Sequence, residues 1–173
     1  MTRVERTSLQ IAWIESPVGL LRAGASQTAL QLLEFVGAQP FDSEHGQGQG
    51  QTQPSARTPL LEQTRRELAE YFAGTRQRFE VPLSFPGTPF QERVWTALCN
   101  IGYGERISYL EQSRRVGDEK AIRAVAQANG QNPIAILVPC HRVINSDGKL
   151  GGYGGGLLRK QFLLDLERGD RLL

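Results

Sequence analysis

The stretch LVPCHRVINSDG, residues 137–148, places Cys140 directly before His141 at the end of an apolar run. The chain has only two cysteines and two histidines, so this adjacency is the first feature to explain. Free cysteines often behave as small buried apolar residues, and Cys140 could simply end a core strand. Alternatively, Cys140 attacks as a thiolate and His141 is its base. Because neighbouring side chains of an extended chain point to opposite faces, proton transfer then requires a bend at Pro139 or a bridging water.

A cysteine and base of this kind usually require a carboxylate that orients the imidazole. The best candidate is Glu167, which lies on a predicted final helix over residues 157–170. The apolar residues of this segment follow helical spacing, at Leu157, Phe162, Leu163 and Leu166. A glutamate on a terminal helix is usually only solvated, so the residue pattern alone leaves the structural and the catalytic interpretations open.

The composition is that of an ordinary globular protein, with 173 residues of which 39% are hydrophobic. Two cysteines, Cys99 and Cys140, provide neither a disulfide framework nor a four-cysteine zinc site. The N-terminal segment MTRVERTSLQ has no apolar signal core, and the apolar run 134–138 is too short to span a bilayer. We therefore expect a cytoplasmic protein with free thiols and no membrane contact.

The charge is distributed unevenly along the chain. Residues 1–85 hold 8 Lys and Arg against 9 Asp and Glu, whereas residues 86–173 hold 12 against 9. A basic second half is compatible with an anionic partner such as nucleic acid. An excess of three charges is common on solvated surfaces, so this indication is weak.

Strand and turn patterns dominate the first half of the chain. We expect strands at residues 9–19, 20–26, 29–37 and 78–85. Between them we expect a loop rich in Gly, Gln, Ser and Pro at residues 38–58 and a helix at residues 59–74. His45 is expected to be a solvated residue of the flexible loop. Thr58 can cap the helix, Pro59 suits its first turn, and Gly74 can end it.

Helical patterns dominate the second half, which begins near residues 84–88. Helices are expected over residues 89–101, 107–117, 118–130 and 157–170, with an extended segment at 132–140 and a flexible Gly-rich loop at 147–156. Thr88 and Gln91 form a capping box for the first of these helices. Gly117 ends the second helix and Asp118 is expected to cap the third, which gives a helix-turn-helix candidate. Cys99, four residues after Trp95, is expected to be a buried structural thiol.

Several of these segments carry a family resemblance. PCHRV at 139–143, preceded by NPIAILV and followed by GGYGGGL, looks like the active-site signature of the bacterial-type O6-alkylguanine-DNA alkyltransferases, also called methylated-DNA–protein-cysteine methyltransferases. FQERVWTAL, YGERISY and AIRAV are similar to family segments in the expected order. The similarity covers roughly residues 86–170, and the first half matches only in general layout.

The resemblance implies two domains. Residues 1–85 would form an α/β domain with a small antiparallel sheet, of the ribonuclease H-like type, and residues 86–173 a mostly helical domain with a winged helix-turn-helix. It also implies direct-reversal DNA repair, in which an alkyl group passes irreversibly, once per molecule, from O6 of guanine to Cys140. O4-alkylthymine is a further substrate to consider. No cofactor is implied, because the substrate itself carries the electrophilic carbon.

The resemblance also assigns roles to the matching residues. His141 would take the thiol proton through a water, and Glu167 would hold His141. The hydroxyl of Tyr109 would contact the guanine and help to neutralise it as the bond breaks. Asn132 would tie the second helix to the active-site segment. The carbonyls of Cys140 and Val143 would accept from the guanine amine, while Tyr153 and the Gly154 amide would line the pocket.

The implied partner is double-stranded DNA containing an alkylated guanine. The base must leave the duplex to be reached, and Arg123, beside Ala124 in AIRAV, would fill the gap in the stack. In this family the helix-turn-helix is inferred to use the minor groove, which suits a protein that scans without reading sequence. The resemblance implies a monomer that could cluster on DNA.

Some positions depart from the family pattern. Gly102 replaces a common proline, and Gln112 and Ser113 occupy core positions of the first helix of the pair, where polar side chains would disturb packing. With no cysteine and one histidine in residues 1–85, we expect no zinc site.

Gly154 stands where relatives often carry a side chain, and we predict that it widens the pocket for larger alkyl groups. Gly154→Ser should then slow transfer from benzylated DNA relative to methylated DNA, measured as the ratio of single-turnover rates. An unchanged ratio would contradict this prediction.

Two rival functions remain at this point. A non-enzymatic DNA-binding module would match the alkyltransferase-like proteins, which share the fold but lack the cysteine. A thiol hydrolase would use Cys140, His141 and Glu167 to release many products per molecule. The AIRAV segment and the basic second half favour a DNA partner over the hydrolase.

Overall fold

The first half of the chain forms an antiparallel sheet of three strands in the order β1-β2-β3. The computed structural model describes residues 8–37 and 54–170, so His45 and most of the predicted 38–58 loop lie outside the described residues. The strands are β1 (Gln10–Ile14), β2 (Leu21–Ala25) and β3 (Leu30–Phe35). The small antiparallel sheet predicted from the sequence is confirmed.

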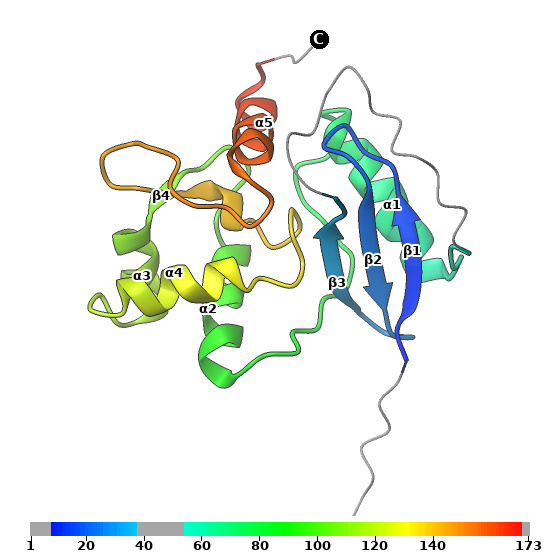
Figure 1. Ribbon diagram of the computed structural model, residues 1–173, viewed down its shortest axis with the longest axis horizontal. Helices are drawn as coiled ribbons and strands as arrows, with labels where there is room; N and C mark the ends of the chain where they lie inside the picture. The colour runs from blue at the N-terminus through cyan, green and yellow to red at the C-terminus, as the bar shows by residue number, and fades with distance from the viewer. Residues whose placement is uncertain (1–7, 38–53, 171–173) are drawn as a thin grey trace, which may run out of the picture.

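Helix α1 (Pro59–Phe72) covers one face of this sheet and packs against β2 (Figure 1). Its caps follow the sequence prediction. The Thr58 hydroxyl accepts a hydrogen bond from the backbone N–H of Leu61 at 3.3 Å. Gly74, which follows the C-cap, has a φ of +76°, a left-handed conformation that glycine adopts without strain.

The second half of the chain is mainly helical and lies beside the sheet in Figure 1. Its helices are α2 (Pro89–Cys99), α3 (Tyr109–Val116), α4 (Ile122–Gly130) and α5 (Leu157–Arg168). The predicted capping box of α2 is present, with Thr88 and Gln91 bonding each other's backbone N–H. A short parallel pair, β4 (Ile107–Ser108) with β5 (Val143–Ile144), was not predicted. It places the start of α3 beside the chain that leaves Cys140.

The buried polar side chains of the α3–α4 pair are hydrogen-bonded to neighbouring groups. Gln112 Nε2 donates to Asn129 Oδ1 at 2.8 Å, and Asn129 Nδ2 donates to Gln112 Oε1 at 2.7 Å. The Ser113 hydroxyl donates to the Tyr109 carbonyl at 2.9 Å. Since buried polar groups are costly only when unpaired, Gln112 and Ser113 do not disturb the packing as the sequence suggested.

The predictions of a strand at residues 78–85 and of a helix start at Asp118 were wrong. Residues 78–85 contain no continuous strand, only a single bridge between Leu83 and Leu30. Helix α4 begins after Ala121, and Asp118 instead accepts from the Lys120 N–H within the preceding turn. Asparagine and aspartate side chains cap turns as readily as helices, so the residue type could not distinguish these two uses.

Cys99 also differs from the prediction, because it is exposed. It is the final residue of α2, where the helix leaves the core. Trp95, four residues earlier, is 2% exposed and donates from Nε1 to the Ala128 carbonyl at 2.8 Å. Helical spacing therefore located the buried tryptophan correctly. It did not show that the last residue of α2 extends beyond the side chains that bury the rest of this face.

The two halves of the chain are joined by backbone hydrogen bonds. The Leu33 N–H donates to the Pro133 carbonyl, and the Ala135 N–H donates to the Leu33 carbonyl, both at 2.8 Å. Strand β3 therefore holds the segment that leads to Cys140. Within residues 8–37 and 54–170, no helix has the length and apolar composition needed to cross a membrane.

Candidate active site

The segment before Cys140 is a series of turns, so the predicted extended segment at 132–140 was wrong. Ile136 adopts a φ of 71°, which is unusual for a β-branched residue. A 3-10 turn, η1 (Cys140–Arg142), follows Pro139. Successive residues of a 3-10 turn are about 120° apart, so Cys140 and His141 do not point to opposite faces as they would in a strand.

Cys140 is a buried thiol, with 9% of its surface exposed. Asn132 Nδ2 contacts Cys140 Sγ at 3.2 Å and the Val138 carbonyl at 2.8 Å, while Asn132 Oδ1 accepts from the Ile134 N–H. Asn132 thus connects the end of α4 to the turns before the cysteine. Burial raises the pKa of Cys140, and the Asn132 hydrogen bond and the Lys160 charge oppose that rise.

His141 and Glu167 form a buried pair. His141 Nε2 lies 2.8 Å from Glu167 Oε1, and both side chains are almost inaccessible to solvent. Burial lowers the pKa of His141, and the Glu167 carboxylate opposes that shift. Nδ1 of His141 is buried and has no hydrogen-bond partner among the described residues. An imidazole bonded through Nε2 keeps Nδ1 available to accept a proton.

Arg142 also binds the Glu167 carboxylate, and the sequence analysis did not predict this contact. Its Nε donates to Glu167 Oε2 and its Nη2 to Glu167 Oε1, both at 2.9 Å. Burial alone would raise the pKa of Glu167, but the hydrogen bonds and charges of His141 and Arg142 hold it well below its usual range. Glu167 is therefore a carboxylate at neutral pH. The signal available in the sequence was the position of Arg142 directly after the Cys–His pair.

Lys160 is a second buried charge that the sequence did not reveal. Its Nζ donates to the carbonyls of Val143 at 2.7 Å and Gly152 at 3.2 Å, and also to the Leu150 carbonyl. Burial lowers the pKa of Lys160 to about 8. Three carbonyls converge on one ammonium, so Lys160 fixes the Gly-rich loop against β5.

A cavity of about 290 Å³ opens beside Cys140. Three parts of the chain line it: β3, the segment from α4 to the cysteine, and the Gly-rich loop. The lining residues are Leu33, Glu34, Phe35, Asn129, Gly130, Asn132, Ala135, Cys140, Tyr153, Gly154 and Gly155. The cavity thus contains a thiol, an amide and an aromatic hydroxyl.

The loop side of the cavity depends on glycines. A Cβ at Gly154 would lie 3.9 Å from the Gly130 carbonyl, so a side chain has room there and its absence leaves space. A Cβ at Gly155 would come within 2.4 Å of the Phe35 ring, so only glycine fits. Phe35 also packs edge-on against Tyr153, with ring centroids 6.0 Å apart. The buried hydroxyl of Tyr153 has no partner among the described residues.

The other predicted residues lie around this centre. Tyr109 is the first residue of α3, half-buried, with its hydroxyl 3.5 Å from the Gly152 carbonyl. Val143 is buried in β5. Arg123 and Ala124 are exposed in the first turn of α4 and do not line the cavity. The predicted pocket residues therefore lie around Cys140, whereas Arg123 lies at the surface, outside the cavity.

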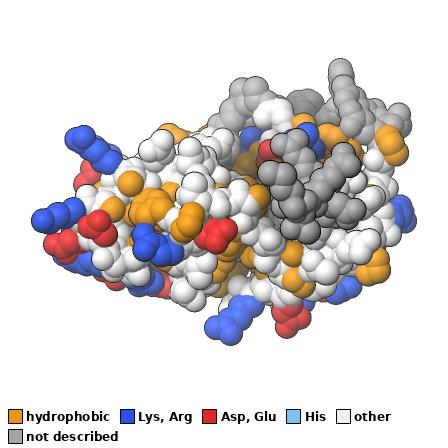
Figure 2. Space-filling view, turned by 90° about the horizontal axis from the view of Figure 1, so that it is seen from below, with side chains coloured by type: hydrophobic (Ala, Val, Ile, Leu, Met, Phe, Trp, Pro, Cys, Tyr) orange, Lys and Arg blue, Asp and Glu red, His pale blue; other side chains and the backbone are white. Residues whose placement is uncertain are grey.

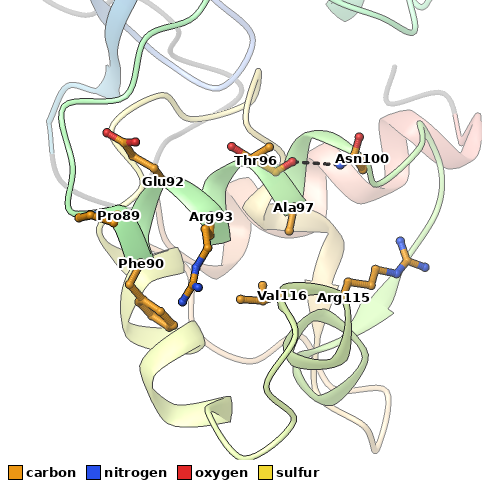
Figure 3. A pocket seen from close by; sticks show the side chains of 9 residues that line it. All are labelled: Pro89, Phe90, Glu92, Arg93, Thr96, Ala97, Asn100, Arg115 and Val116. Atoms are coloured by element: carbon orange, nitrogen blue, oxygen red, sulfur yellow. Dashed lines mark hydrogen bonds between the residues drawn. The ribbon is translucent and has the colours of Figure 1, made fainter.

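A second, more open hollow lies between α2 and the end of α3 (Figure 3). It measures about 1010 Å³ and its lining includes Phe90, Arg93 and Val116. None of the predicted site residues lines it, and it has no thiol or histidine. Nucleophilic chemistry is therefore assigned to the smaller cavity at Cys140.

Comparisons with known proteins agree with this geometry. Residues 89–169 match the family model described as 6-O-methylguanine DNA methyltransferase, DNA binding domain. A methylated-DNA–protein-cysteine methyltransferase of Mycolicibacterium paratuberculosis is 47% identical over 90% of both chains. The crystal structure of Mycobacterium tuberculosis O6-methylguanine methyltransferase superposes with a TM-score of 0.78, at 40% identity over 94% of both chains. A structure of the M. tuberculosis protein in complex with DNA also has a TM-score of 0.78, at 41% identity over 92% of this chain and 93% of that one. The chain belongs to the methylated-DNA–protein-cysteine methyltransferase family.

Proposed function

We propose that Cys140 accepts an alkyl group from O6 of guanine in DNA and thereby restores the base. The observation that carries this assignment is a buried thiol, bonded to Asn132, in a cavity next to a buried His141–Glu167 pair. The thiolate attacks the alkyl carbon, a C–S bond forms, and the C–O6 bond breaks with its electron pair moving to O6. The thioether is permanent, so each molecule acts once.

The remaining site residues support this transfer. His141 accepts the Cys140 proton at Nδ1 through a water, and Glu167 orients the imidazole. The Tyr109 hydroxyl donates toward the guanine as O6 is released. Burial raises the pKa of Tyr109, which keeps that hydroxyl protonated at neutral pH. The carbonyls of Cys140 and Val143 accept from the guanine amine, and Tyr153 with the Gly154 amide faces O6.

DNA binding is assigned to the α3–α4 pair, used as a winged helix-turn-helix in the minor groove of double-stranded DNA. Arg123, exposed on α4, fills the space left by the flipped base, next to Ala124. On the face shown in Figure 2, Lys and Arg side chains are interspersed with Asp and Glu. Among the described residues, that face therefore shows no continuous positive patch.

The same proposal includes the domain types, the oligomeric state, the cellular location and a second substrate. Residues 1–85 form a ribonuclease H-like domain and residues 86–173 the transfer domain. The protein works as a monomer in the cytoplasm, where a free thiol persists, and needs no cofactor. O4-alkylthymine is a candidate second substrate, because it presents the same alkyl–oxygen bond.

Intact-protein mass after incubation with duplex DNA carrying one O6-methylguanine tests the transfer. The wild type should gain a single CH₂, about 14 Da, and stop at one per molecule, because the nucleophile is consumed. Cys140→Ser should gain nothing, while Cys99→Ser, which removes the exposed thiol, should behave like wild type. Lesion binding without a mass gain would favour a binding module, and repeated product release would favour a hydrolase.

A further inference from the structure

Helix α1 reaches the His141–Glu167 pair from the first half of the chain. The Tyr71 hydroxyl, near the end of α1, donates to Glu167 Oε1 at 2.7 Å, across 96 positions of sequence. Tyr71 is 0% exposed, and Glu167 is 6% exposed. This contact is therefore a buried, charge-assisted hydrogen bond, of the class that is short and strong.

Glu167 Oε1 is shared by three donors. It lies 2.8 Å from His141 Nε2, 2.9 Å from Arg142 Nη2 and 2.7 Å from the Tyr71 hydroxyl. The other oxygen, Oε2, accepts from Arg142 Nε at 2.9 Å and from the Gly104 N–H at 3.4 Å. Each donor draws on the negative charge of the carboxylate. The charge available to His141 is therefore set partly by Tyr71.

Tyr71 is itself packed among aromatic rings and remains a donor. Its ring packs against Phe72 and Phe79, each at a centroid distance of 5.3 Å, and against Tyr103 at 6.1 Å. Burial and the neighbouring Glu167 raise the pKa of Tyr71 well above its usual value. The hydroxyl thus keeps its proton at neutral pH.

We propose that Tyr71 is a positioning residue for alkyl transfer, whose hydroxyl fixes Glu167 and through it the ring of His141. This inference rests on the proposed roles of Cys140 and His141. It makes α1 part of the active site and gives the first half of the chain a function in the reaction. Tyr71 also restrains the carboxylate from stabilising a protonated imidazole, so His141 stays neutral and able to accept the thiol proton.

Other titratable groups also face this pair. Cys140 and Arg142 share η1 with His141, Lys160 lies on α5, and Tyr103 belongs to the turn before β4. Among these, Arg142 and Lys160 lower the pKa of His141. All of them remain when the Tyr71 hydroxyl alone is removed. A shift seen in Tyr71→Phe would therefore report that one hydrogen bond.

The first test is the single-turnover rate of methyl transfer from duplex DNA between pH 5 and 9. Tyr71→Phe should slow the plateau rate about 10-fold, since misplaced catalytic groups lose rate steeply. Its acid limb should move up by about 0.5–1 pH unit, because Glu167 then attracts the His141 proton more strongly. Tyr103→Phe is the matched control. It removes a hydroxyl from the same aromatic cluster, but that hydroxyl lies 3.5 Å from the Leu166 carbonyl and makes no hydrogen bond with Glu167.

The second test is NMR titration of the imidazoles, which does not require transfer. The chain has two histidines, so His45 serves as the internal reference for His141. The His141 pKa should rise in Tyr71→Phe and stay unchanged in Tyr103→Phe. A lowered Tm with unaltered rate, acid limb and titration would make Tyr71 a purely structural residue and overturn the inference. If wild type shows no methyl transfer but the His141 shift occurs, the proposed function fails while the Tyr71–Glu167–His141 coupling stands.

Discussion

Glu167→Gln is expected to lower the free energy of unfolding at pH 7 by about 3–5 kcal/mol, the usual cost of breaking a buried ion pair. Glu167 and Arg142 are 6% exposed each, and two hydrogen bonds of 2.9 Å join them. Glutamine cannot match the guanidinium with two oxygens, so Arg142 would keep a buried charge without its partner. Urea denaturation of both proteins measures the difference.

The same substitution should change the acid sensitivity of the protein. The pKa of Glu167 is held well below its usual range in the folded state, so its contribution is complete above the unfolded value, about 4.3. That contribution is lost as the pH falls from there toward the depressed folded value, because the unfolded state then binds the additional proton. Wild type should therefore lose stability more steeply than Glu167→Gln below about pH 4.

Asp165→Asn is the matched control, since Asp165 lies on the same helix and pairs with the exposed Arg168 at 2.9 Å. A surface pair of this kind contributes about 0–1 kcal/mol. If Glu167→Gln cost no more than Asp165→Asn, the buried network would not be a main source of stability. An equal acid slope in wild type and Glu167→Gln would lead to the same conclusion.

Local patterns predicted the regular elements well. Alternating apolar residues located β1 to β3, and side-chain caps located the starts of α1 and α2 at Thr58 and Thr88. These features depend on neighbours within a few residues, so a single sequence contains them. The family signature then directed attention to Cys140, which the structure places in a cavity.

Predictions failed where distant segments decide the conformation. The apolar run before Cys140 suits a strand, yet it folds into turns because β3 bonds it only at Pro133 and Ala135. On α5 the apolar residues predicted the inner face, but Leu157 is 52% exposed whereas Arg159 and Lys160 are buried. Long cationic side chains are normally solvated. The residues next to Lys160 in the sequence therefore do not indicate that it is buried and donates to carbonyls of β5 and the Gly-rich loop.

Lys160→Met is expected to slow methyl transfer by about 100-fold, because an error of about 1 Å in the position of reacting groups has that effect. The substitution keeps an unbranched apolar chain but removes the donor to the carbonyls of Val143, Leu150 and Gly152. The Val143 carbonyl belongs to the proposed guanine site, and Gly152 directly precedes Tyr153, which lines the cavity. Losing the donor should also cost about 1–3 kcal/mol of stability, the penalty for leaving buried acceptors unpaired. Single-turnover kinetics with methylated duplex DNA and urea denaturation provide the two values.

Lys149→Met is the control that distinguishes the loss of the Lys160 hydrogen bonds from the loss of one positive charge that attracts DNA. Lys149 belongs to the same loop, but its side chain is 82% exposed and its only ion-pair partner among the described residues is Asp147 at 3.7 Å. Lys149→Met should therefore transfer methyl groups within about twofold of wild type, as expected for a surface position away from the site. If both variants lost rate equally, and added salt slowed wild type to the same extent, the loss of rate would come from weaker electrostatic attraction between the protein and DNA. A large loss confined to Lys160→Met would instead show that the buried ammonium holds the loop in the position that alkyl transfer requires.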